Sequence, residues 1–293
     1  MKILITGGSG LLGQYLNVEL SQKYQILTLF NSNIGNCKNF NSIKLDITDQ
    51  LSMQNVFNDY KPNIVIHTAA ISNPILTKHI SAKDVYKINV DATKNIAELC
   101  DKYNSKLIYT STDLVYAGYR GLMLKEDAKL IPASLYAETK LMGEVKIQNT
   151  FDNYLILRTA LLFGFGLNDS KNHFHQMCIN LQSSKHVKLF TDQVRTPLSL
   201  LEAARIINEL LNVDIKLEII NFGGPQRVSR FEFGEKVCEL TGLNKSLLTK
   251  ITMDDVPELA KVEDVSMNTD KLKSYGIKQK KLDEMILETL NNN

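Results

Sequence analysis

The stretch that decides the fold is MKILITGGSGLLG, residues 1–13. It begins with a short apolar run, long enough for a buried strand and too short for a helix. Gly7, Gly10 and Gly13 follow, and residues 11–20 have the pattern of an amphipathic helix. Between a strand and a helix, such glycines permit a tight turn, close approach of the backbone to a pyrophosphate, and close packing of helix on strand. We therefore expect a phosphate-binding unit at the helix N-terminus, with a glycine-rich turn that binds nothing as the alternative.

The composition is that of a soluble globular enzyme. Of the 293 residues 44% are hydrophobic and 23% charged, and the net charge of +2 does not favour nucleic-acid binding. No apolar run approaches the roughly 20 residues that span a bilayer, and the first residues do not have the pattern of a signal peptide. His173 and His175 lack the neighbours that would complete a metal site, so we expect no metal. The cysteines are scattered without CxxC spacing, which indicates free thiols and a cytoplasmic location; they are Cys37, Cys100, Cys178 and Cys238.

Strand and helix patterns alternate along most of the chain. We expect strands at 2–6, 24–30, 43–45, 64–67, 106–109, 155–158 and 218–221, and helices at 11–20, 50–60, 82–103, 134–149, 172–183, 200–212, 230–242 and 281–291. This order predicts an α/β fold, a Rossmann-type doubly wound parallel sheet that binds its ligand at the carboxyl ends of the strands.

The alternation weakens beyond residue 160, which predicts two domains. We expect residues 1–163 to form a dinucleotide-binding domain to which residues 199–224 return. Residues 164–198 and 225–293 are expected to form a smaller C-terminal lobe that binds the substrate.

The ends of the second and third expected strands bear on the cofactor. An acidic residue after the second strand would bind the adenosine ribose and favour NAD, but Asn31 and two further polar residues stand there. Without that acid, a 2′-phosphate meets no repulsion, which slightly favours NADP. Asp46 ends the third strand, where its carboxylate can bind the adenine amino group; the alternative is a helix N-cap role for Asp46 or Asp49. Small residues Ala69 and Ala70 after the fourth strand would let a dinucleotide lie close to the backbone.

Tyr136 and Lys140 are four residues apart on an expected helix, so their side chains share one face. An ammonium about 4 Å from a phenol favours the phenolate by roughly 4 kcal/mol at an effective dielectric of 20. We therefore expect Lys140 to lower the pKa of Tyr136 toward the range in which it exchanges a proton with a substrate oxygen. Thr112 lies just past the expected fifth strand, where its hydroxyl can share that oxygen; the alternative is a Ser/Thr-rich turn.

At this point several motifs together resemble a known family. TGGSGLLG, Asp46, HTAA, Asn89, STDLVYAG, YAETKLMGE and RTALLFG occur in the order typical of the extended short-chain dehydrogenase/reductase superfamily. Within it, the spacing of STDLVYAG and Tyr136, with ILRTALLFG and DQVRTP, is similar to dTDP-4-dehydrorhamnose reductases. The resemblance covers residues 1 to about 165 strongly and the remainder more loosely.

The resemblance implies roles for individual residues. Thr112, Tyr136 and Lys140 correspond to the Ser/Thr–Tyr–Lys triad, and Asn89 to a residue that orients the lysine. The implied cofactor-binding residues are Gly7, Gly10, Leu11, Leu12, Gly13, Asn31, Asp46, Ile47, Ala69, Ala70, Asn89, Tyr136 and Lys140. The implied substrate-binding residues are Thr112, Asn172 and Arg195, with Arg195 on the diphosphate because its guanidinium donates two parallel bonds. A surface salt bridge is the alternative for Arg195.

Two departures from the family pattern leave the sugar open. The reductases usually carry Trp where this chain has Leu161, and Gly-Arg where it has Ala137 and Glu138. We therefore keep three hypotheses. The first is NAD(P)H-dependent reduction of a nucleotide-linked 4-keto-deoxysugar, with Tyr136 as general acid. The second is an NAD-dependent nucleotide-sugar epimerase; a dehydratase is disfavoured because Leu114 stands where those enzymes carry Glu.

The third hypothesis is a non-catalytic nucleotide-binding subunit that resembles the regulatory β subunit of methionine adenosyltransferase. The resemblance also suggests a homodimer.

Overall fold

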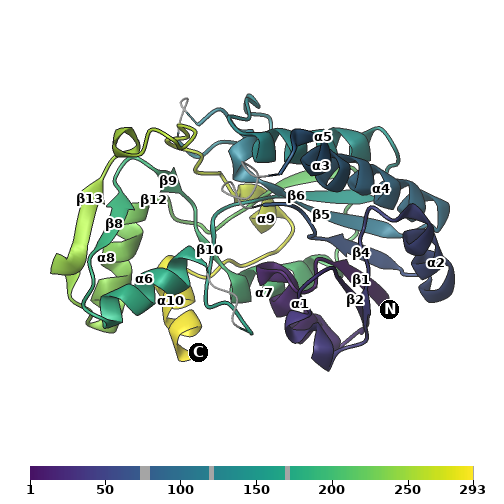
Figure 1. Ribbon diagram of the computed structural model, residues 1–293, viewed down its shortest axis with the longest axis horizontal. Coiled ribbons are helices and arrows are strands. Elements are labelled where there is room, and N and C mark those ends of the chain that lie inside the picture. Colours follow the sequence, from purple (N-terminus) through teal and green to yellow (C-terminus); the bar gives the residue numbers. More distant parts are fainter. Residues whose placement is uncertain (73–79, 119–121, 169–171, 293) are drawn as a thin grey trace.

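The computed structural model describes residues 1–72, 80–118, 122–168 and 172–292 and contains one large parallel sheet (Figure 1). Its seven strands lie in the order β11-β6-β5-β4-β1-β2-β3. The strands are β1 (Lys2–Thr6), β2 (Gln25–Phe30), β3 (Ser42–Lys44), β4 (Ile64–His67), β5 (Lys106–Thr112), β6 (Tyr154–Thr159) and β11 (Glu218–Phe222). All paired neighbours run parallel. The strand order reverses beside β1, so the expected doubly wound α/β fold is confirmed, and its ligand crevice is expected at the carboxyl ends of β1 and β4.

Alternation along β1 places its apolar side chains on both faces of the sheet. Ile3 and Ile5 join the core cluster that contains α1 (Leu11–Ser21) and α7 (Leu200–Leu210). Leu4, between them, joins the cluster on the opposite face. That face is covered by α2 (Gln50–Tyr60), α4 (Ala92–Lys102) and α5 (Leu135–Gln148). Successive residues of a strand point to opposite faces, so one short apolar run is buried on both sides.

Two elements of this half differ from the prediction. The helix expected at 82–103 contains α3 (Ala82–Tyr86), a π-helical turn at Lys87–Asp91 and then α4. The fifth strand, expected to end at residue 109, continues to Thr112 as β5. Its last three residues, Thr-Ser-Thr, are buried in a central strand, and the two threonines suit such a strand because they are β-branched, although they are polar.

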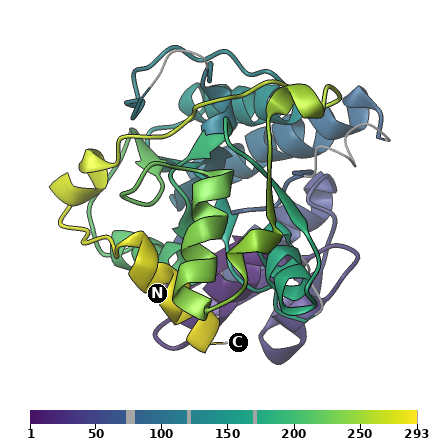
Figure 2. The same ribbon diagram turned by 90° about the vertical axis from the view of Figure 1, so that its left-hand side faces the viewer.

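The second half of the chain builds a lobe beside the sheet. It contains α6 (His173–Gln182), α8 (Arg230–Thr241) and α10 (Leu282–Asn291), whereas α9 (Asp270–Ser274) packs on β11 at the edge of the sheet. Seen from the side of the lobe, α8 and α10 pack side by side in green and yellow (Figure 2). Aromatic side chains at the centre of the lobe, Phe163, Phe174 and Phe233, belong to the same core cluster as α1 and α7. The lobe is therefore packed continuously with one face of the sheet.

Short strands in this half were not predicted. β8 (Val187–Phe190) pairs in parallel with β13 (Leu248–Ile251), and β9 (Val194–Arg195) pairs antiparallel with β12 (Val228–Ser229). β7 (Leu162–Phe163) pairs with β10 (Leu198–Ser199). Each has two to four residues, too few for a periodic pattern, and each partner lies far along the chain. No helix in the described ranges is long and apolar enough to cross a membrane.

Candidate active site

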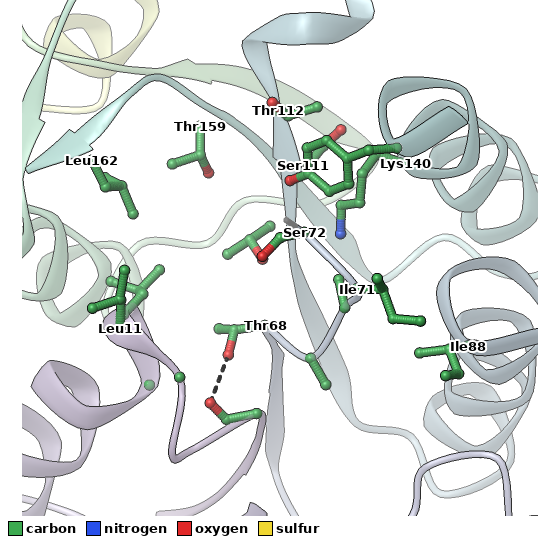
Figure 3. Close-up of a pocket in the computed structure, with 18 of the residues that line it drawn as sticks. Leu11, Thr68, Ile71, Ser72, Ile88, Ser111, Thr112, Lys140, Thr159 and Leu162 are labelled. Carbon is green, nitrogen blue, oxygen red and sulfur yellow. Dashed lines mark hydrogen bonds between the residues drawn. The ribbon is translucent and has the colours of Figure 1, made fainter. Parts of the chain in front are cut away.

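A cleft of about 800 Å³ opens at the carboxyl ends of the central strands, between the sheet and the lobe. Figure 3 shows Leu11 and Thr68 on one side of it and Thr112 and Lys140 on another. Of the residues expected to bind cofactor or substrate, those that line it are Gly7, Gly10, Leu11, Leu12, Gly13, Asn31, Asp46, Ile47, Ala69, Ala70, Thr112, Tyr136, Lys140 and Arg195. The fold thus brings side chains that are up to 188 residues apart in the sequence into one cavity (7 and 195).

The glycine turn between β1 and α1 forms one wall of the cleft. Gly7 has φ +70°, a backbone conformation that L side chains rarely adopt. A Cβ on Gly13 would lie 2.2 Å from the carbonyl oxygen of Gly7, so only glycine lets α1 pack this closely on the turn. Gly10 is the N-cap of α1 and supplies no side-chain cap. The first amides of α1 therefore meet the cleft uncapped, as an anion such as a pyrophosphate requires. A dinucleotide fits this wall.

Two aspartates at the expected adenosine side of the cleft, Asp46 and Asp49, have different roles in the structure. Asp49 is the N-cap of α2 and accepts a hydrogen bond from the amide of Ser52. Asp46 is exposed at the cleft, and its Oδ1 accepts from the amide of Thr48 at 2.9 Å. The N-cap alternative is therefore correct for Asp49 and wrong for Asp46, which leaves the second carboxylate oxygen of Asp46 available to a ligand.

Asn89 does not line the cleft. It is buried in the π-helical turn, where its Oδ1 accepts from the amide of Ile71 and its Nδ2 donates to the hydroxyl of Thr139. It thereby ties the segment after β4 to α5, directly beside Lys140. This placement does not support direct contact of Asn89 with a cofactor. It supports a role in positioning Lys140, because the Thr139 that Asn89 binds precedes Lys140 on α5.

Tyr136 and Lys140 lie in the first two turns of α5, whose N-cap Ser134 accepts from the amide of Ala137. Lys140 is buried, and its Nζ lies 4.0 Å from the ring centroid of Tyr109 on β5. Burial lowers the pKa of Lys140 to about 7, and the charge of Glu144 opposes that change. The ammonium is thus held over an aromatic face, a contact that favours its charged form.

The expectation that the pKa of Tyr136 is lowered is wrong for this structure. The pKa of Tyr136 is raised to about 12 because burial penalises the phenolate and the carboxylate of Asp113 repels it; an interaction with the Thr112 hydroxyl acts in the opposite direction. Sequence spacing places two side chains on one helix face, but it does not report the desolvation that governs the phenol. Tyr136 therefore holds its proton firmly at neutral pH.

Thr112 is the last residue of β5 and pairs in register with Thr159 of β6. The expectation that it lies just past the strand is therefore wrong. Its buried hydroxyl lies 3.2 Å from Oδ1 of Asp113 and 3.3 Å from the amide of Leu114. The strand end thus fixes the hydroxyl at the floor of the cleft (Figure 3).

Asp113 was missed by the sequence reasoning, although it directly follows Thr112 in TSTD. Its side chain is buried at the cleft, and burial raises its pKa to about 6 while Arg195 opposes the change. Within the described part of the chain its Oδ2 makes no hydrogen bond, but it lies 3.6 Å from Nε of Arg195. The only signal available was an acid next to a candidate site hydroxyl.

The two residues expected on the substrate lie in different environments. Arg195 lines the cleft and is buried, so the surface-salt-bridge alternative is wrong. Its Nη1 donates to the carbonyls of Val194 and Glu263, and its Nη2 donates to the carbonyl of Val262, so the backbone fixes its direction. Asn172 does not line the cleft. It is the N-cap of α6: its Oδ1 accepts from the amide of His175, and its Nδ2 donates to the carbonyl of Gly164. Both ends of the Asn172 amide are used by the backbone.

Among the residues that the structure describes, no group of three or more His, Cys, Asp or Glu side chains is placed to hold a metal ion. The four cysteines are buried and free.

Comparisons with known proteins agree with this architecture. The chain is 27% identical over 273 residues to a dTDP-4-dehydrorhamnose reductase of Aggregatibacter actinomycetemcomitans, covering 89% of this chain and 87% of that protein. It is 25% identical over 291 residues to methionine adenosyltransferase 2 subunit beta of Pongo abelii, covering 95% and 84%.

Solved structures superpose over the whole chain. A dTDP-4-dehydrorhamnose reductase ortholog of Clostridium acetobutylicum is 27% identical, with a TM-score of 0.84 over 100% of this chain and 99% of that one. The enzyme of that name from Bacillus anthracis, in complex with NADP, is 22% identical with a TM-score of 0.87 over 100% and 99%, a likeness of fold. The model of the RmlD substrate binding domain matches residues 1–293. The chain therefore belongs to the RmlD substrate-binding domain family.

Proposed function

We propose that this protein is an NAD(P)-dependent reductase of a nucleotide-linked 4-keto sugar. The observation that carries the proposal is the convergence of Thr112, Tyr136 and Lys140 on one cleft whose opposite wall is a glycine turn that fits a dinucleotide. The relatives support a reductase-like function, because several of them are dTDP-4-dehydrorhamnose reductases.

The side chains of this cleft suit protonation of a carbonyl oxygen. Bound nicotinamide cofactor supplies the hydride in such chemistry. Tyr136, with its pKa near 12, keeps a proton that it can donate to an oxygen that becomes an alkoxide. The Thr112 hydroxyl hydrogen-bonds to the same oxygen and fixes its position. Lys140 then stabilises the tyrosinate that remains, which requires the ammonium form.

The cofactor preference is a finer point of the proposal. Asn31, Ser32 and Asn33 line the adenosine end of the cleft, and an acid that would repel a 2′-phosphate is not among them. We therefore expect NADPH to be used somewhat better than NADH. Asn31→Asp places a carboxylate at that end and should reverse the preference, measured as kcat/KM for the two cofactors in parallel. Equal use of both cofactors by both proteins would contradict this point.

We assign the substrate to the side of the cleft that faces the lobe, residues 164–198 and 225–293. Arg195 is the candidate for the charge of its diphosphate: its Nη1 and Nη2 donate to backbone carbonyls, and its guanidinium lines the cleft as a fixed cation. Asn172 is not included, because its amide caps α6. The nucleotide and the sugar are to be identified by assay.

The test is a panel of nucleotide-linked keto sugars, including dTDP-4-dehydrorhamnose, assayed with NADPH and NADH. Net oxidation of one cofactor equivalent per sugar reduced supports the proposal. A nucleotide-sugar epimerase recycles its cofactor, so conversion of a sugar without net oxidation would instead show the epimerase.

A second candidate function is that of a non-catalytic regulatory subunit, favoured by the similarity to methionine adenosyltransferase 2 subunit beta over 95% of this chain. A chain of that kind oxidises no cofactor with any sugar of the panel and co-purifies with a partner enzyme. Size-exclusion chromatography with light scattering of the purified chain would also test the expected homodimer. The cytoplasmic location predicted from the free cysteines is tested by fractionation.

A further inference from the structure

The hydroxyl of Thr112 has one proton, and the structure shows where that proton points. The hydroxyl donates to Oδ1 of Asp113 at 3.2 Å and accepts from the amide of Leu114 at 3.3 Å. A hydroxyl has one donor and two acceptor sites, so one acceptor site is left. The phenol of Tyr136, which holds its proton firmly, interacts with this hydroxyl and can donate to that site. Thr112 thus stands between a phenol and a carboxylate.

The charge of Asp113 decides what the Thr112 hydroxyl can do. While Asp113 is ionised, the hydroxyl proton is held by the carboxylate and is not directed at a substrate oxygen. A carboxylate only accepts hydrogen bonds, whereas a protonated carboxyl also donates one. Protonation of Asp113 therefore reverses the contact. The carboxyl then donates to Oγ1 of Thr112, and the hydroxyl proton is free to turn toward the phenol and the cleft.

The surroundings of Asp113 allow both of its protonation states. Thr112 contacts it from the end of β5, Arg195 approaches Oδ2 from β9 at 3.6 Å, and Tyr136 faces it from α5. Arg195 favours the ionised form and burial favours the protonated form, so that the pKa of Asp113 is raised to about 6. Asp264 acts on Arg195 from the lobe and is itself paired with Arg227.

The other buried acid beside the site, Glu144, shows what a carboxylate with a structural role looks like in this fold. Both of its oxygens accept from the guanidinium of Arg158, and Oε1 also accepts from the hydroxyl of Ser111. Asp113 differs, because its Oδ2 makes no hydrogen bond to any residue in the described ranges, although it is buried. Asp113 also lines the cleft, which gives its carboxyl access to water when the products leave.

We propose that Asp113 returns to Tyr136, through the hydroxyl of Thr112, the proton that the phenol gives to the substrate oxygen. The inference rests on the proposed function, because each reduction of a carbonyl consumes one proton.

The proton moves in three steps that follow the contacts described above. The O–H bond of Tyr136 breaks as its proton passes to the alkoxide oxygen. The hydroxyl proton of Thr112 then passes to the tyrosinate, while the proton of the Asp113 carboxyl passes to Oγ1 of Thr112. The carboxylate that remains is stabilised by Arg195 and takes up a proton from the solvent. One proton enters from solvent per turnover, and no electron moves along the chain. Asp113 acts through Thr112 and is therefore a positioning residue.

The test separates the first turnover from the later ones. Asp113→Asn keeps the shape of the side chain, and its amide can donate to Thr112 as the protonated carboxyl does, but it cannot release that proton. With an excess of the keto sugar and reduced cofactor that the wild type uses best, the variant should oxidise about one cofactor equivalent per chain at nearly the wild-type rate. Later turnovers should be about a hundredfold slower than in the wild type.

Two further kinetic readouts distinguish proton return from a structural role. Imidazole, a small proton donor near neutral pH, should speed the later turnovers of Asp113→Asn in proportion to its concentration and should not speed the wild type. The steady-state rate of the wild type should fall as the pH rises through the pKa of Asp113, about 6, and this fall should be absent from the variant.

The matched control is Asp264→Asn. It removes another carboxylate whose charge acts on Arg195, but one that is paired with Arg227 instead of Thr112. Its first and later turnovers should have the same rate. A burst in this variant would mean that the charge balance of Arg195, and not a proton from Asp113, limits the later turnovers.

Infrared spectroscopy of the full chain without ligand gives a readout that needs no turnover and no folded Asp113→Asn protein. Lowering the pH through the pKa of Asp113 should produce the band of a protonated carboxyl. The band should shift in Thr112→Val, which removes the hydroxyl that the carboxyl contacts. A band at the same frequency in both proteins would overturn the proposal.

The kinetic outcomes separate this proposal from the proposed function. If Asp113→Asn turns over at the wild-type rate, the proton does not come from Asp113, and the reductase assignment stands. If its first and later turnovers slow equally, Asp113 acts in the reduction step or binds the sugar, which also overturns the proposal. If the wild type oxidises no cofactor with any keto sugar, the proposed function falls and proton return by Asp113 falls with it.

Discussion

The two sides of the cleft present different chemistry to a ligand. The side built by β1, α1 and β4 presents backbone and small side chains: Gly7, Gly10, Gly13, Ala69 and Ala70. The lobe side and the floor present buried ionisable groups such as Asp113 and Arg195. The first side can recognise a ligand by close approach of the backbone, and the Cβ of a substituted glycine would block that approach. The second side can recognise a ligand by charge, and burial of its charged groups costs free energy of folding.

The same contrast separates buried charges that hold the fold from those that face the cleft. Arg158 and Glu144 lie beneath the cleft, and their charges are satisfied within the protein, including a 2.5 Å hydrogen bond from Ser111 to Glu144. Lys140 and Asp113 face the cleft, and each has a pKa displaced in the direction that burial dictates. Displaced pKa values of this kind concentrate at functional sites. Substitutions of residues in each group test this distinction.

The largest effect is expected for Glu144→Ala. The change leaves the Arg158 guanidinium buried without its carboxylate partner and removes the acceptor of the hydrogen bond from Ser111. We expect a loss of about 3–5 kcal/mol in the free energy of unfolding, measured by urea denaturation. Glu209→Ala, which removes a half-exposed partner of Arg205 on α7, is the control and should cost less than about 1 kcal/mol. Equal losses in the two variants would mean that the Arg158 cluster does not stabilise the fold.

Gly13→Ala tests the close-approach side of the cleft. The new Cβ would lie 2.2 Å from the Gly7 carbonyl oxygen and 2.7 Å from the Cα of Gly8, both backbone atoms. We expect a loss of about 3 kcal/mol in stability, together with loss of cofactor binding measured by fluorescence titration.

The control for this change is Gly242→Ala at the C-cap of α8. Gly242 has φ +70°, but a Cβ there meets nothing within 4 Å. It should cost only about 1–2 kcal/mol of backbone strain and leave cofactor binding intact. Unimpaired cofactor binding by Gly13→Ala would contradict the assignment of the glycine turn.

A smaller effect that depends on pH is expected for Lys140→Met. The unfolded chain holds this proton up to a pKa of about 10.5 and the folded chain only up to about 7, so wild-type stability should rise with pH between these values. The variant lacks this dependence. It should melt at a higher temperature than the wild type near pH 6, and the difference should shrink toward pH 10.

Lys94→Met, at an exposed position on α4, is the control and should show no such convergence. If the difference in melting temperature between Lys140→Met and the wild type were constant across this pH range, protonation of Lys140 would not destabilise the folded protein.

The parts of the site that the sequence predicted correctly depend on local geometry. A glycine turn between a strand and a helix, and two side chains four residues apart on a helix, are determined within about a dozen residues. The structure accordingly places Gly7, Gly13, Tyr136 and Lys140 on the cleft.

The parts that could not be predicted depend on which segments bury one another. The rise in the pKa of Tyr136 comes from burial and from Asp113. Asn172 is the N-cap of α6, and an asparagine that caps a helix resembles a ligand-binding amide when only the sequence is read. Strands of two to four residues, such as β8 and β13, leave no periodic signal for their pairing.

The account depends most directly on Tyr136 as the proton donor of the cleft, and Tyr136→Phe tests it in one pair of measurements. With the keto sugar and cofactor that the wild type uses best, kcat should fall on the order of a thousandfold, since only the phenolic hydroxyl is removed and general-acid catalysis is worth about this much. The dissociation constant for the cofactor should stay within about twofold of the wild type. Turnover near the wild-type rate in the Tyr136→Phe protein would contradict the account.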